Sequence, residues 1–325
     1  MININVNARK LLPWGLVPVL LLTAPTGRAT LGTGFSAQKA SFSVIYKDYA
    51  SAYRLNGAFV LPGESLEFSA MPHKNVPYQF SGAAGTWQAK AENAWMWKAP
   101  AKPGLQELTI TDPTTNETVR VNVFVMVPAK SVKNGAINGY KIGSYPAAPK
   151  TYSKKYLPPR GFIEVTQENK HTFVSPHFKL SQFLCKQTGS YPKYIVLDEL
   201  LVQKLESILL EVNSHGIGCP TLTVMSGFRT PHYNKALGSA RFSRHMWGDA
   251  ADVYVDESPR DGIMDDLNAD GRFDKRDSQF LAQLVEKMGR KPGNGKLSGG
   301  LGVYRPNKAH GPFVHVDTRG KDARW

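Results

Sequence analysis

Three polar side chains beside short apolar segments constrain most strongly how this chain folds. Six residues separate His245 from Asp252, and His315 lies much later in the chain, within the apolar segment 313–317. Two imidazoles and one carboxylate leave a tetrahedral zinc ion with one open coordination position, which a catalytic zinc requires. A fold that uses these three side chains together must bring their segments side by side.

The pattern of residues 161–325 predicts an α+β domain. Short strands are expected at 221–225, 251–255 and 313–317, and the last two carry Asp252 and His315. Asp198 is expected to cap a helix that ends at Gly216, and Asp277 is expected to cap a second helix that runs to Gly289. The candidate ligands therefore lie on or beside strands of one sheet, where the backbone fixes their positions.

Three ordered motifs surround the candidate ligands: Ser226-Gly-Phe-Arg229, Ser243-x-His245-x-x-Gly248-x-Ala250-x-Asp252 and Phe313-Val-His315-Val-Asp317. Together they resemble the motifs of the zinc D-Ala-D-Ala carboxypeptidases, which share a fold with the lysostaphin-type endopeptidases and sonic hedgehog. A periplasmic branch of these peptidases is similar also at Gly299-Gly-Leu-Gly-Val-Tyr304. The resemblance covers roughly 161–325 and implies a hedgehog/D-Ala-D-Ala-peptidase-like zinc domain.

The resemblance also implies roles for single residues. His245, Asp252 and His315 match the three zinc ligands, and Ser243 and Gly248 match the turn that presents the first of them. Arg229 matches the arginine that grips the carbonyl or terminal carboxylate of the substrate, a task that suits its guanidinium fork. The implied reaction is zinc-assisted amide hydrolysis, as a carboxypeptidase or a murein endopeptidase.

The general base is left open by the sequence. Many relatives place an acid three residues before the last histidine, or a histidine two residues before it, where this chain has Pro312 and Phe313. His310, five residues before His315, is one substitute, and contact with the substrate or the transition state is the role favoured for it. Asp317 is another, since it alternates onto the same strand face as His315 and could either take a proton or orient that ligand.

A second ion site is predicted at 266–277, between the two halves of the zinc site. Oxygen-bearing side chains stand at loop positions 1, 3, 5, 9 and 12, with Gly271 at position 6, which is the pattern of an EF-hand calcium loop. The alternative is a solvated acidic turn. The expected calcium ligands are Asp266, Asn268, Asp270, the carbonyl of Arg272, Asp274 and Asp277.

The N-terminal half has a different character. Alternating strands and Pro-Gly or Asn turns in 40–128 predict an all-β immunoglobulin-like sandwich, with Trp95 and Trp97 as candidate core residues. It would serve as a spacer or as a wall-binding module. Residues 129–160 are rich in Gly, Pro, Tyr and Lys, as linkers are.

Export is the expected fate of the chain. An apolar run after Arg9 and Lys10 predicts a signal peptide or an N-terminal anchor over residues 1–29, and an uncleaved segment would tether the protein to a membrane. The expected location is the periplasm or cell envelope. In an oxidising compartment the pair Cys185 and Cys219 predicts a disulfide, with two buried thiols as the alternative.

The net charge indicates an anionic partner. Lysine and arginine number 40 against 26 acidic residues, a formal charge of +14. Export and the metal motif argue against nucleic acid and favour peptidoglycan stem peptides. Two functions remain: an exported zinc metallopeptidase that hydrolyses D-alanine-containing bonds of peptidoglycan, or a catalytically weak, zinc-containing cell-wall-binding protein.

Overall fold

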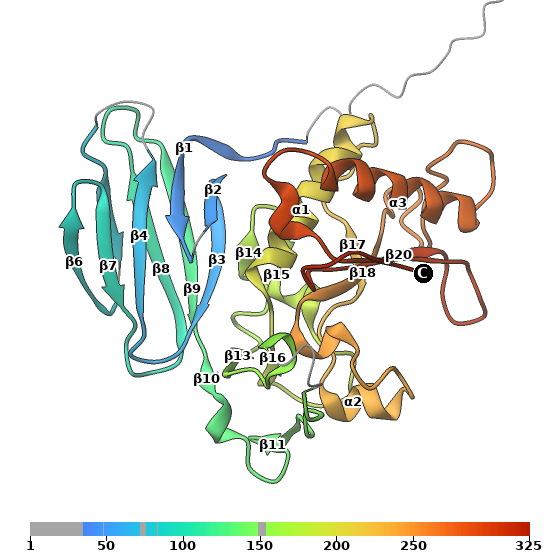
Figure 1. Ribbon diagram of the computed structural model, residues 1–325, viewed down its shortest axis with the longest axis horizontal. Helices are drawn as coiled ribbons and strands as arrows, with labels where there is room; N and C mark the ends of the chain where they lie inside the picture. Colours follow the sequence, from blue (N-terminus) through green and yellow to red (C-terminus); the bar gives the residue numbers. More distant parts are fainter. Residues whose placement is uncertain (1–34, 48, 72–75, 83, 149–153) are drawn as a thin grey trace, which may run out of the picture.

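The computed structural model describes residues 35–47, 49–71, 76–82, 84–148 and 154–325. A sheet-rich N-terminal part lies beside a C-terminal part that contains the long helices and a further sheet (Figure 1). The predicted signal segment 1–29 lies outside the described residues. No helix in the described ranges is both long and apolar enough to span a membrane.

Two sheets form the N-terminal part. The five-stranded sheet has the order β2-β1-β4-β7-β6, with β1 (Lys39–Tyr46), β2 (Tyr49–Tyr53), β4 (Ser65–Met71), β6 (Thr86–Ala91) and β7 (Ala94–Lys98). The four-stranded sheet has the order β3-β9-β8-β5, with β3 (Leu55–Val60), β5 (Gln79–Gly82), β8 (Gly104–Thr111) and β9 (Thr118–Val125). Apolar residues of both sheets form one core, which includes Trp95 and Trp97 as expected.

The segment after the second sheet packs against the C-terminal part. It contains β10 (Val127–Pro128), η1 (Ala129–Ser131), β11 (Ala136–Ile137) and β12 (Tyr140–Lys141), and β10 pairs with β13 (Gly161–Val165). The Tyr145 hydroxyl donates to the Met246 carbonyl at 2.9 Å, and the Ile142 carbonyl accepts from the His232 amide at 2.9 Å. These contacts fix the described part of the segment.

Direct contacts join the two parts of the chain. Lys47 forms an ion pair with Glu199, whose carboxylate also accepts from the Phe59 amide at 3.0 Å. His177 bonds Glu206 of the C-terminal part at 2.7 Å and the Ser36 carbonyl at 2.9 Å.

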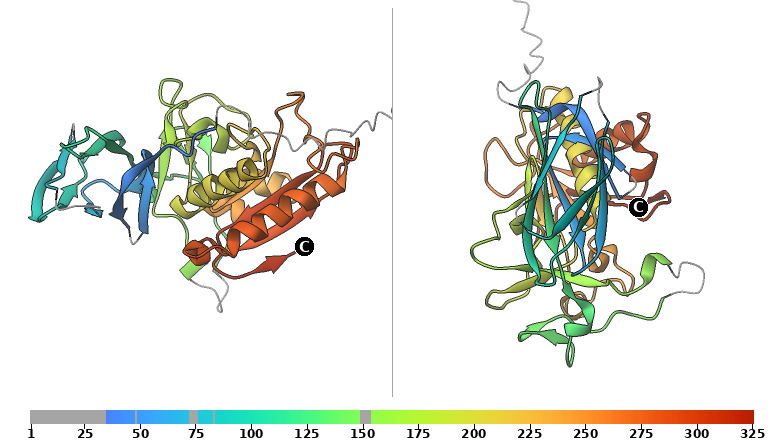
Figure 2. Two further views of the ribbon diagram at one scale, coloured as in Figure 1. Left: turned by 90° about the horizontal axis from the view of Figure 1, so that it is seen from above. Right: turned by 90° about the vertical axis from the view of Figure 1, so that its left-hand side faces the viewer.

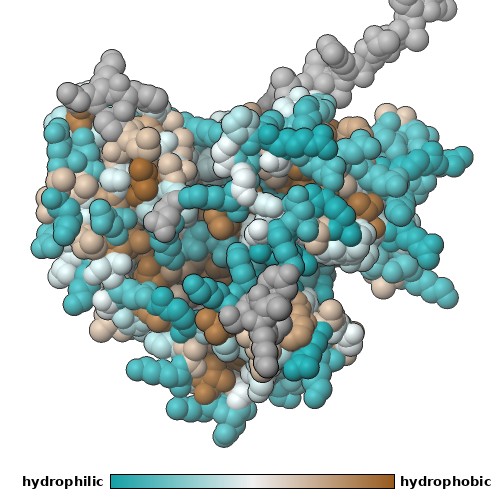
Figure 3. All heavy atoms as spheres, in the orientation of Figure 1, coloured by the Kyte–Doolittle hydropathy of each residue, from teal (hydrophilic) through white to brown (hydrophobic). Residues whose placement is uncertain are grey.

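Hydrophilic residues cover most of the C-terminal part on the face drawn in Figure 3, while hydrophobic residues gather over the N-terminal sheets.

A five-stranded sheet is the centre of the C-terminal part. Its order is β17-β18-β20-β19-β21, with β17 (Thr223–Ser226), β18 (Ala250–Tyr254), β19 (Gly300–Tyr304), β20 (Phe313–Asp317) and β21 (Ala323–Arg324). Smaller strands precede it: β14 (Phe173–Ser175), β15 (Phe178–Lys179) and β16 (Lys193–Ile195). The three strands predicted from the sequence match β17, β18 and β20 to within two residues at each end.

Two long helices, α1 (Glu199–Ser214) and α3 (Lys275–Gly289), lie side by side against this sheet (Figure 2). Asp198 caps α1 as predicted, since its carboxylate accepts from the amides of Leu200 and Leu201. The predicted start of α3 was wrong by three residues. Asp274 is the cap, and Asp277 completes a capping box by accepting from the Asp274 amide.

Alternation along β20 divides its side chains between two environments. Val314 and Val316 belong to the apolar core that α1 and α3 share with the sheet. His315 and Asp317 therefore point to the opposite face, because successive residues of a strand point to opposite sides. That face carries the candidate site.

The predicted disulfide is not formed. Both Cys185 and Cys219 are buried free thiols. They have different neighbours: Cys185 lies beside the Tyr140 hydroxyl, whereas the Cys219 thiol donates to the Thr221 carbonyl at 3.1 Å. Burial raises the pKa of Cys219 to about 12, so this cysteine stays a protonated thiol at neutral pH. Counting cysteines predicted a disulfide, and the alternative of two buried thiols is the one found.

Candidate metal centre and active site

One row of residues crosses four strands of the central sheet. Ser226 of β17 lies opposite Asp252 of β18, Asp252 opposite His315 of β20, and His315 opposite Gly302 of β19. Directly opposed residues point to the same face of a sheet. The row therefore presents a hydroxyl, a carboxylate and an imidazole side by side, next to a position with no side chain.

His245 completes a cluster of three possible metal ligands. It lies on η4 (Arg244–Trp247), and its Nε2 is 3.3 Å from Oδ1 of Asp252. Nδ1 of His315 is 2.9 Å from the same oxygen. All three side chains are buried, and one ligand atom of each lies within 4.8 Å of the others. Among the described residues this is the only such group of three histidine, cysteine or acidic side chains.

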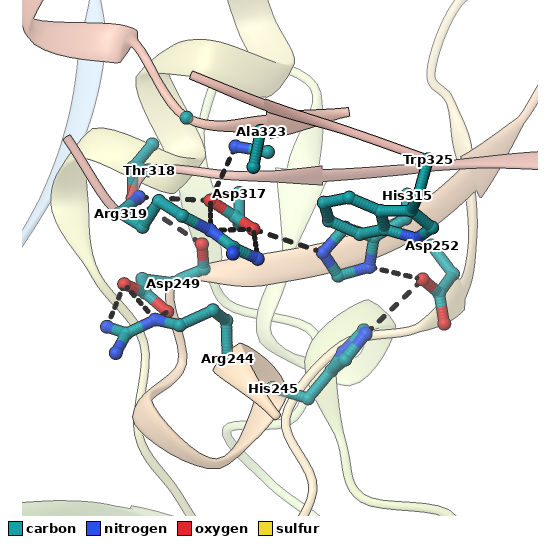
Figure 4. A network of polar contacts seen from close by, with 12 residues as sticks. Arg244, His245, Asp249, Asp252, His315, Asp317, Thr318, Arg319, Ala323 and Trp325 are labelled. Carbon is teal, nitrogen blue, oxygen red and sulfur yellow. Dashed lines mark hydrogen bonds and ion pairs between the residues drawn. The ribbon is translucent and has the colours of Figure 1, made fainter. Parts of the chain in front are cut away.

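The ring nitrogens of both imidazoles that face away from the cluster are held by hydrogen bonds, and Figure 4 shows the one between His315 and Asp317. Nδ1 of His245 donates to the Gly227 carbonyl at 2.7 Å, and Nε2 of His315 faces Oδ2 of Asp317 at 3.3 Å. When the ring nitrogen that faces away from the cluster carries the proton, the nitrogen that faces the cluster keeps a lone pair that can bind a metal. The two rings therefore offer Nε2 of His245 and Nδ1 of His315 to one point.

The electrostatics of the cluster favour a cation. Burial opposes ionisation of Asp252, yet the charge of His245 and the hydrogen bonds from His245 and His315 outweigh it and hold the pKa of Asp252 well below its usual range. Burial likewise opposes the charge on His315, but Asp252 and Asp317 on either side raise the pKa of His315 above 6.5. Once a metal displaces the protons that the two rings share with Asp252, two imidazole nitrogens and an ionised carboxylate form a suitable donor set for zinc.

Asp317 lies on the outer side of His315, away from the ligand atom Nδ1. It is fully buried, accepts from the Gly300 amide at 2.8 Å, and receives two donors of the Arg319 guanidinium at 2.9 and 2.5 Å. Burial raises its pKa, but the bonds from His315 and Arg319 outweigh this and hold the pKa of Asp317 well below its usual range. Of the two roles left open by the sequence, this position matches the orientation of a ligand and not the removal of a proton.

Arg229 contacts a candidate ligand. Its Nη2 donates to Oδ2 of Asp252 at 2.7 Å and its Nε donates to the Ser226 hydroxyl at 2.8 Å. Oδ1 of Asp252 is thereby left to face the two imidazoles. Arg229 also lines the cavity beside the cluster, where the sequence resemblance expects the arginine that grips substrate.

His310 lies at the same cavity, on the loop between β19 and β20. Its Nδ1 bonds the Gly311 carbonyl at 2.8 Å, its Nε2 contacts the Asn307 amide nitrogen at 2.8 Å, and its ring meets Phe313 edge to face. Asp317 forms a hydrogen bond with the candidate ligand His315, whereas the hydrogen bonds of His310 go to Gly311 and Asn307. His310 is thus separate from the metal cluster but shares its cavity.

The turn that presents His245 depends on Gly248. This residue has a φ of +70° and follows η4 directly. A Cβ atom here would lie 2.2 Å from the Val196 carbonyl oxygen, and the Gly248 carbonyl accepts from the Asp198 amide. Both the left-handed backbone and the close approach require glycine.

Two residues of the site were missed from the sequence. Arg319 holds Asp317, and Trp325 lies with its ring centroid 5.2 Å from that of His315. Figure 4 shows both beside the metal cluster. The spacing Asp317-x-Arg319 is the one local signal for the first. Trp325 had none, because only the pairing of β21 with β19 brings it to the site.

A cavity of about 620 Å³ opens in front of the cluster. It is lined by His245, Asp252 and His315, by the basic residues Arg229, Arg244, His310 and Arg319, and by Met225, Ser239, Ala240, Phe242, Ser243, Tyr304, Phe313 and Trp325. This volume lies within the usual range of ligand-binding pockets.

The predicted calcium loop is bonded to itself. Asp266 accepts from the amides of Asp270 and Gly271, and Asp277 accepts from those of Leu267 and Asp274. The acidic side chains of 266–277 do not form a cluster of the kind that joins the zinc-ligand candidates in the described residues. Calcium binding by this loop stays a prediction.

Comparison with known proteins adds one finding. A family model described as Peptidase M15 matches residues 156–275. The matched region contains Arg229, His245 and Asp252, and it ends before His315. No curated protein matches the chain.

Proposed function

The C-terminal half of this chain belongs to the peptidase M15 family, and on this premise we propose that the protein is a zinc peptidase that hydrolyses D-alanine-containing peptide bonds of peptidoglycan. The observation that carries the proposal is the convergence of His245, Asp252 and His315 on one point at the wall of a large cavity. The family consists of metallopeptidases, and this cluster is the place for its metal.

The residues present fit zinc. Nε2 of His245, Oδ1 of Asp252 and Nδ1 of His315 would hold it, and three protein ligands leave a position for a reactant. When bound, zinc supplies Lewis acidity that polarises a carbonyl and lowers the pKa of water. Because Gly227 and Asp317 hold the outer ring nitrogens, the ligand atoms are oriented before the metal arrives.

Arg229 is placed to bind the scissile carbonyl or a terminal carboxylate. It lies at the cavity wall and is held by Asp252 and Ser226 through Nη2 and Nε. Nη1, the other end of the guanidinium fork, suits an oxyanion. A fixed positive charge at this point stabilises negative charge that develops on the substrate.

We assign proton transfer to His310. The other ionisable groups of the cavity are ligand candidates, arginines, or Tyr304, whose hydroxyl accepts from the Trp325 indole at 2.7 Å. An imidazole can both take and return a proton, which suits this role. His310→Ala is expected to lower kcat about 10²- to 10⁴-fold and to leave zinc affinity unchanged. Equal losses of kcat and zinc affinity would remove His310 from this role.

The substrate class and the location rest on charge and on the N-terminal sequence. A formal charge of +14 favours an anionic polymer such as the cell wall, and the apolar segment within 1–29 supports export to the periplasm or cell envelope. A signal peptide that stays uncleaved would keep the protein at the membrane.

The test is hydrolysis of defined muropeptides by the zinc-loaded protein. Free D-alanine indicates a carboxypeptidase, and loss of cross-linked dimers indicates an endopeptidase; mass spectrometry follows both. His315→Ala serves as the metal-ligand control and is expected to abolish turnover. Absence of turnover, together with wall binding that survives His315→Ala, would refute the peptidase and identify a wall-binding protein.

A further inference from the structure

The backbone of Trp325 is fixed against the edge of the central sheet. β21 pairs in parallel with β19, with Gly300 opposite Ala323 and Leu301 opposite Arg324. The pairing continues through Trp325, whose amide donates to the Leu301 carbonyl at 3.3 Å and whose carbonyl accepts from the Val303 amide at 2.9 Å. The position of this residue is therefore set by the sheet that carries the metal cluster.

The indole of Trp325 is held by three neighbours. Its Nε1 donates to the Tyr304 hydroxyl at 2.7 Å, and the Arg319 guanidinium lies 5.2 Å from the ring centroid. The ring lies 5.2 Å from that of His315, at an interplanar angle of 45° (Figure 4). A hydrogen bond and a cation–π contact give the ring one orientation.

Two glycines of β19 make room for this ring. A Cβ on Gly300 would lie 2.8 Å from Cη2 of Trp325, and a Cβ on Gly302 would lie 2.5 Å from its Nε1. Neither glycine has a positive φ, so space and not backbone conformation explains them. The Gly-x-Gly spacing within 299–304 thus places the indole flat across β19, beside the row that carries His315.

Despite these contacts, Trp325 is 49% exposed. It also lines the cavity in front of the metal cluster. A large aromatic surface that is held rigid and left open to a cavity is typical of a binding surface, because its rotamer entropy is already lost before a ligand arrives. Metal binding does not require this open face, since the hydrogen bonds of His315 do not involve the indole.

We propose that the exposed face of Trp325 forms one wall of the substrate subsite and packs against the aliphatic side chain of the peptide residue beside the scissile bond. The inference rests on the peptidase function proposed above and assigns it a specificity-determining residue. Contact with a flat apolar ring favours a methyl or methylene group at that position over a charged one.

The test compares the variants Trp325→Ala and Trp325→Phe with the control Trp87→Ala. Trp87 lies on β6 of the N-terminal part and is 47% exposed, so the control removes an indole of similar exposure away from the metal cluster. Isothermal titration gives the affinity of each zinc-loaded protein for a stem peptide, and competition with a chelator gives its affinity for zinc. KM and kcat follow from D-alanine release or cross-link loss. Trp325→Ala is expected to weaken peptide binding and to raise KM by about 10-fold, with zinc affinity unchanged.

Trp325→Phe should recover part of this loss, and Trp87→Ala should match the wild type. Gly302→Ala is expected to raise KM as well, because its methyl group would displace the ring without removing it. The inference fails if Trp325→Ala binds peptide like the wild type, or if it loses zinc affinity while KM of the zinc-loaded fraction is unchanged. A wild-type protein that neither binds nor cleaves stem peptides would instead refute the peptidase function itself.

Discussion

Replacement of Asp317 by asparagine tests how the site holds its metal. The change preserves the shape of a fully buried side chain but removes its charge and one acceptor oxygen. In the wild type, His315 and Arg319 direct donors at Oδ2, while Gly300 and Arg319 direct donors at Oδ1. The NH₂ group of an asparagine faces donors in either orientation, so the bond that fixes the outer nitrogen of His315 is lost or weakened.

The expected size of the effect follows from that one bond. Loss of a partner that orients a ligand typically lowers metal affinity about 10- to 100-fold. At about 1.4 kcal/mol per tenfold change, this equals roughly 1.4–2.8 kcal/mol, the range of a hydrogen bond to a charged group. We therefore expect Asp317→Asn to weaken zinc binding by this amount and to retain activity once zinc is in excess.

Zinc affinity is measured by competition with a chromophoric chelator, next to Asp249→Asn as a matched control. Asp249 is also buried and paired with an arginine, Arg244, but it contacts neither candidate histidine ligand. Both variants should lose thermal stability, and only Asp317→Asn should lose zinc affinity. If Asp317→Asn binds zinc as tightly as the wild type but loses kcat at saturating zinc, Asp317 acts on a proton and our reasoning about its position is wrong.

Two further predictions concern the turn at the site and the contact between the two parts of the chain. Gly248→Ala combines a left-handed backbone with a methyl group 2.2 Å from the Val196 carbonyl oxygen, and should lower the free energy of unfolding in denaturant by at least about 3 kcal/mol. The control Gly238→Ala, at a φ of +63° with open space around it, should lower it by only about 1–2 kcal/mol. Equal losses of stability in the two variants would show that the close approach to Val196 does not matter. Burial opposes the charge of His177, but the hydrogen bond and charge of Glu206 outweigh it and raise the pKa of His177 above 6.5. The stability that depends on this charge is complete below the usual pKa and is lost as pH rises through the raised pKa. The difference in Tm between wild type and His177→Gln should therefore shrink as pH rises above about 6.5, and a constant difference would refute this prediction.

Much of the candidate site followed from local sequence. Apolar alternation placed Asp252 and His315 on strands, and Asp198 marked the start of α1, because these signals depend on neighbours a few residues away. The role of Asp317 could not be predicted from the sequence. Strand alternation puts Asp317 on the same face as His315, but does not say which of the two ring nitrogens it contacts. Only the orientation of the ring, with Nδ1 towards Asp252, separates these roles.

Long-range pairing explains the remaining differences. Trp325 reaches the site because β21 adds to the edge of the sheet beside β19, a parallel pairing with no signature in either short segment. For the cysteines the sequence predicted a long-range contact that is not formed: Cys185 and Cys219 were expected to form a disulfide, but both are buried free thiols. A residue count says nothing about Cα separation, and geometry decides whether a disulfide forms.

The metal cluster is supported by an arginine on each side. Arg229 holds the oxygen of Asp252 that faces away from the histidines, and Arg319 holds Asp317, which in turn holds the outer nitrogen of His315. Arg319 helps to hold the pKa of Asp317 well below its usual range, and Arg229 forms an ion pair with Asp252. Both arginines also line the cavity. Ligand orientation and the positive charge offered to substrate are thus coupled through the same two side chains. We therefore expect a substitution of either arginine to change metal binding and substrate binding together, so that only zinc affinity measured without substrate separates the two effects.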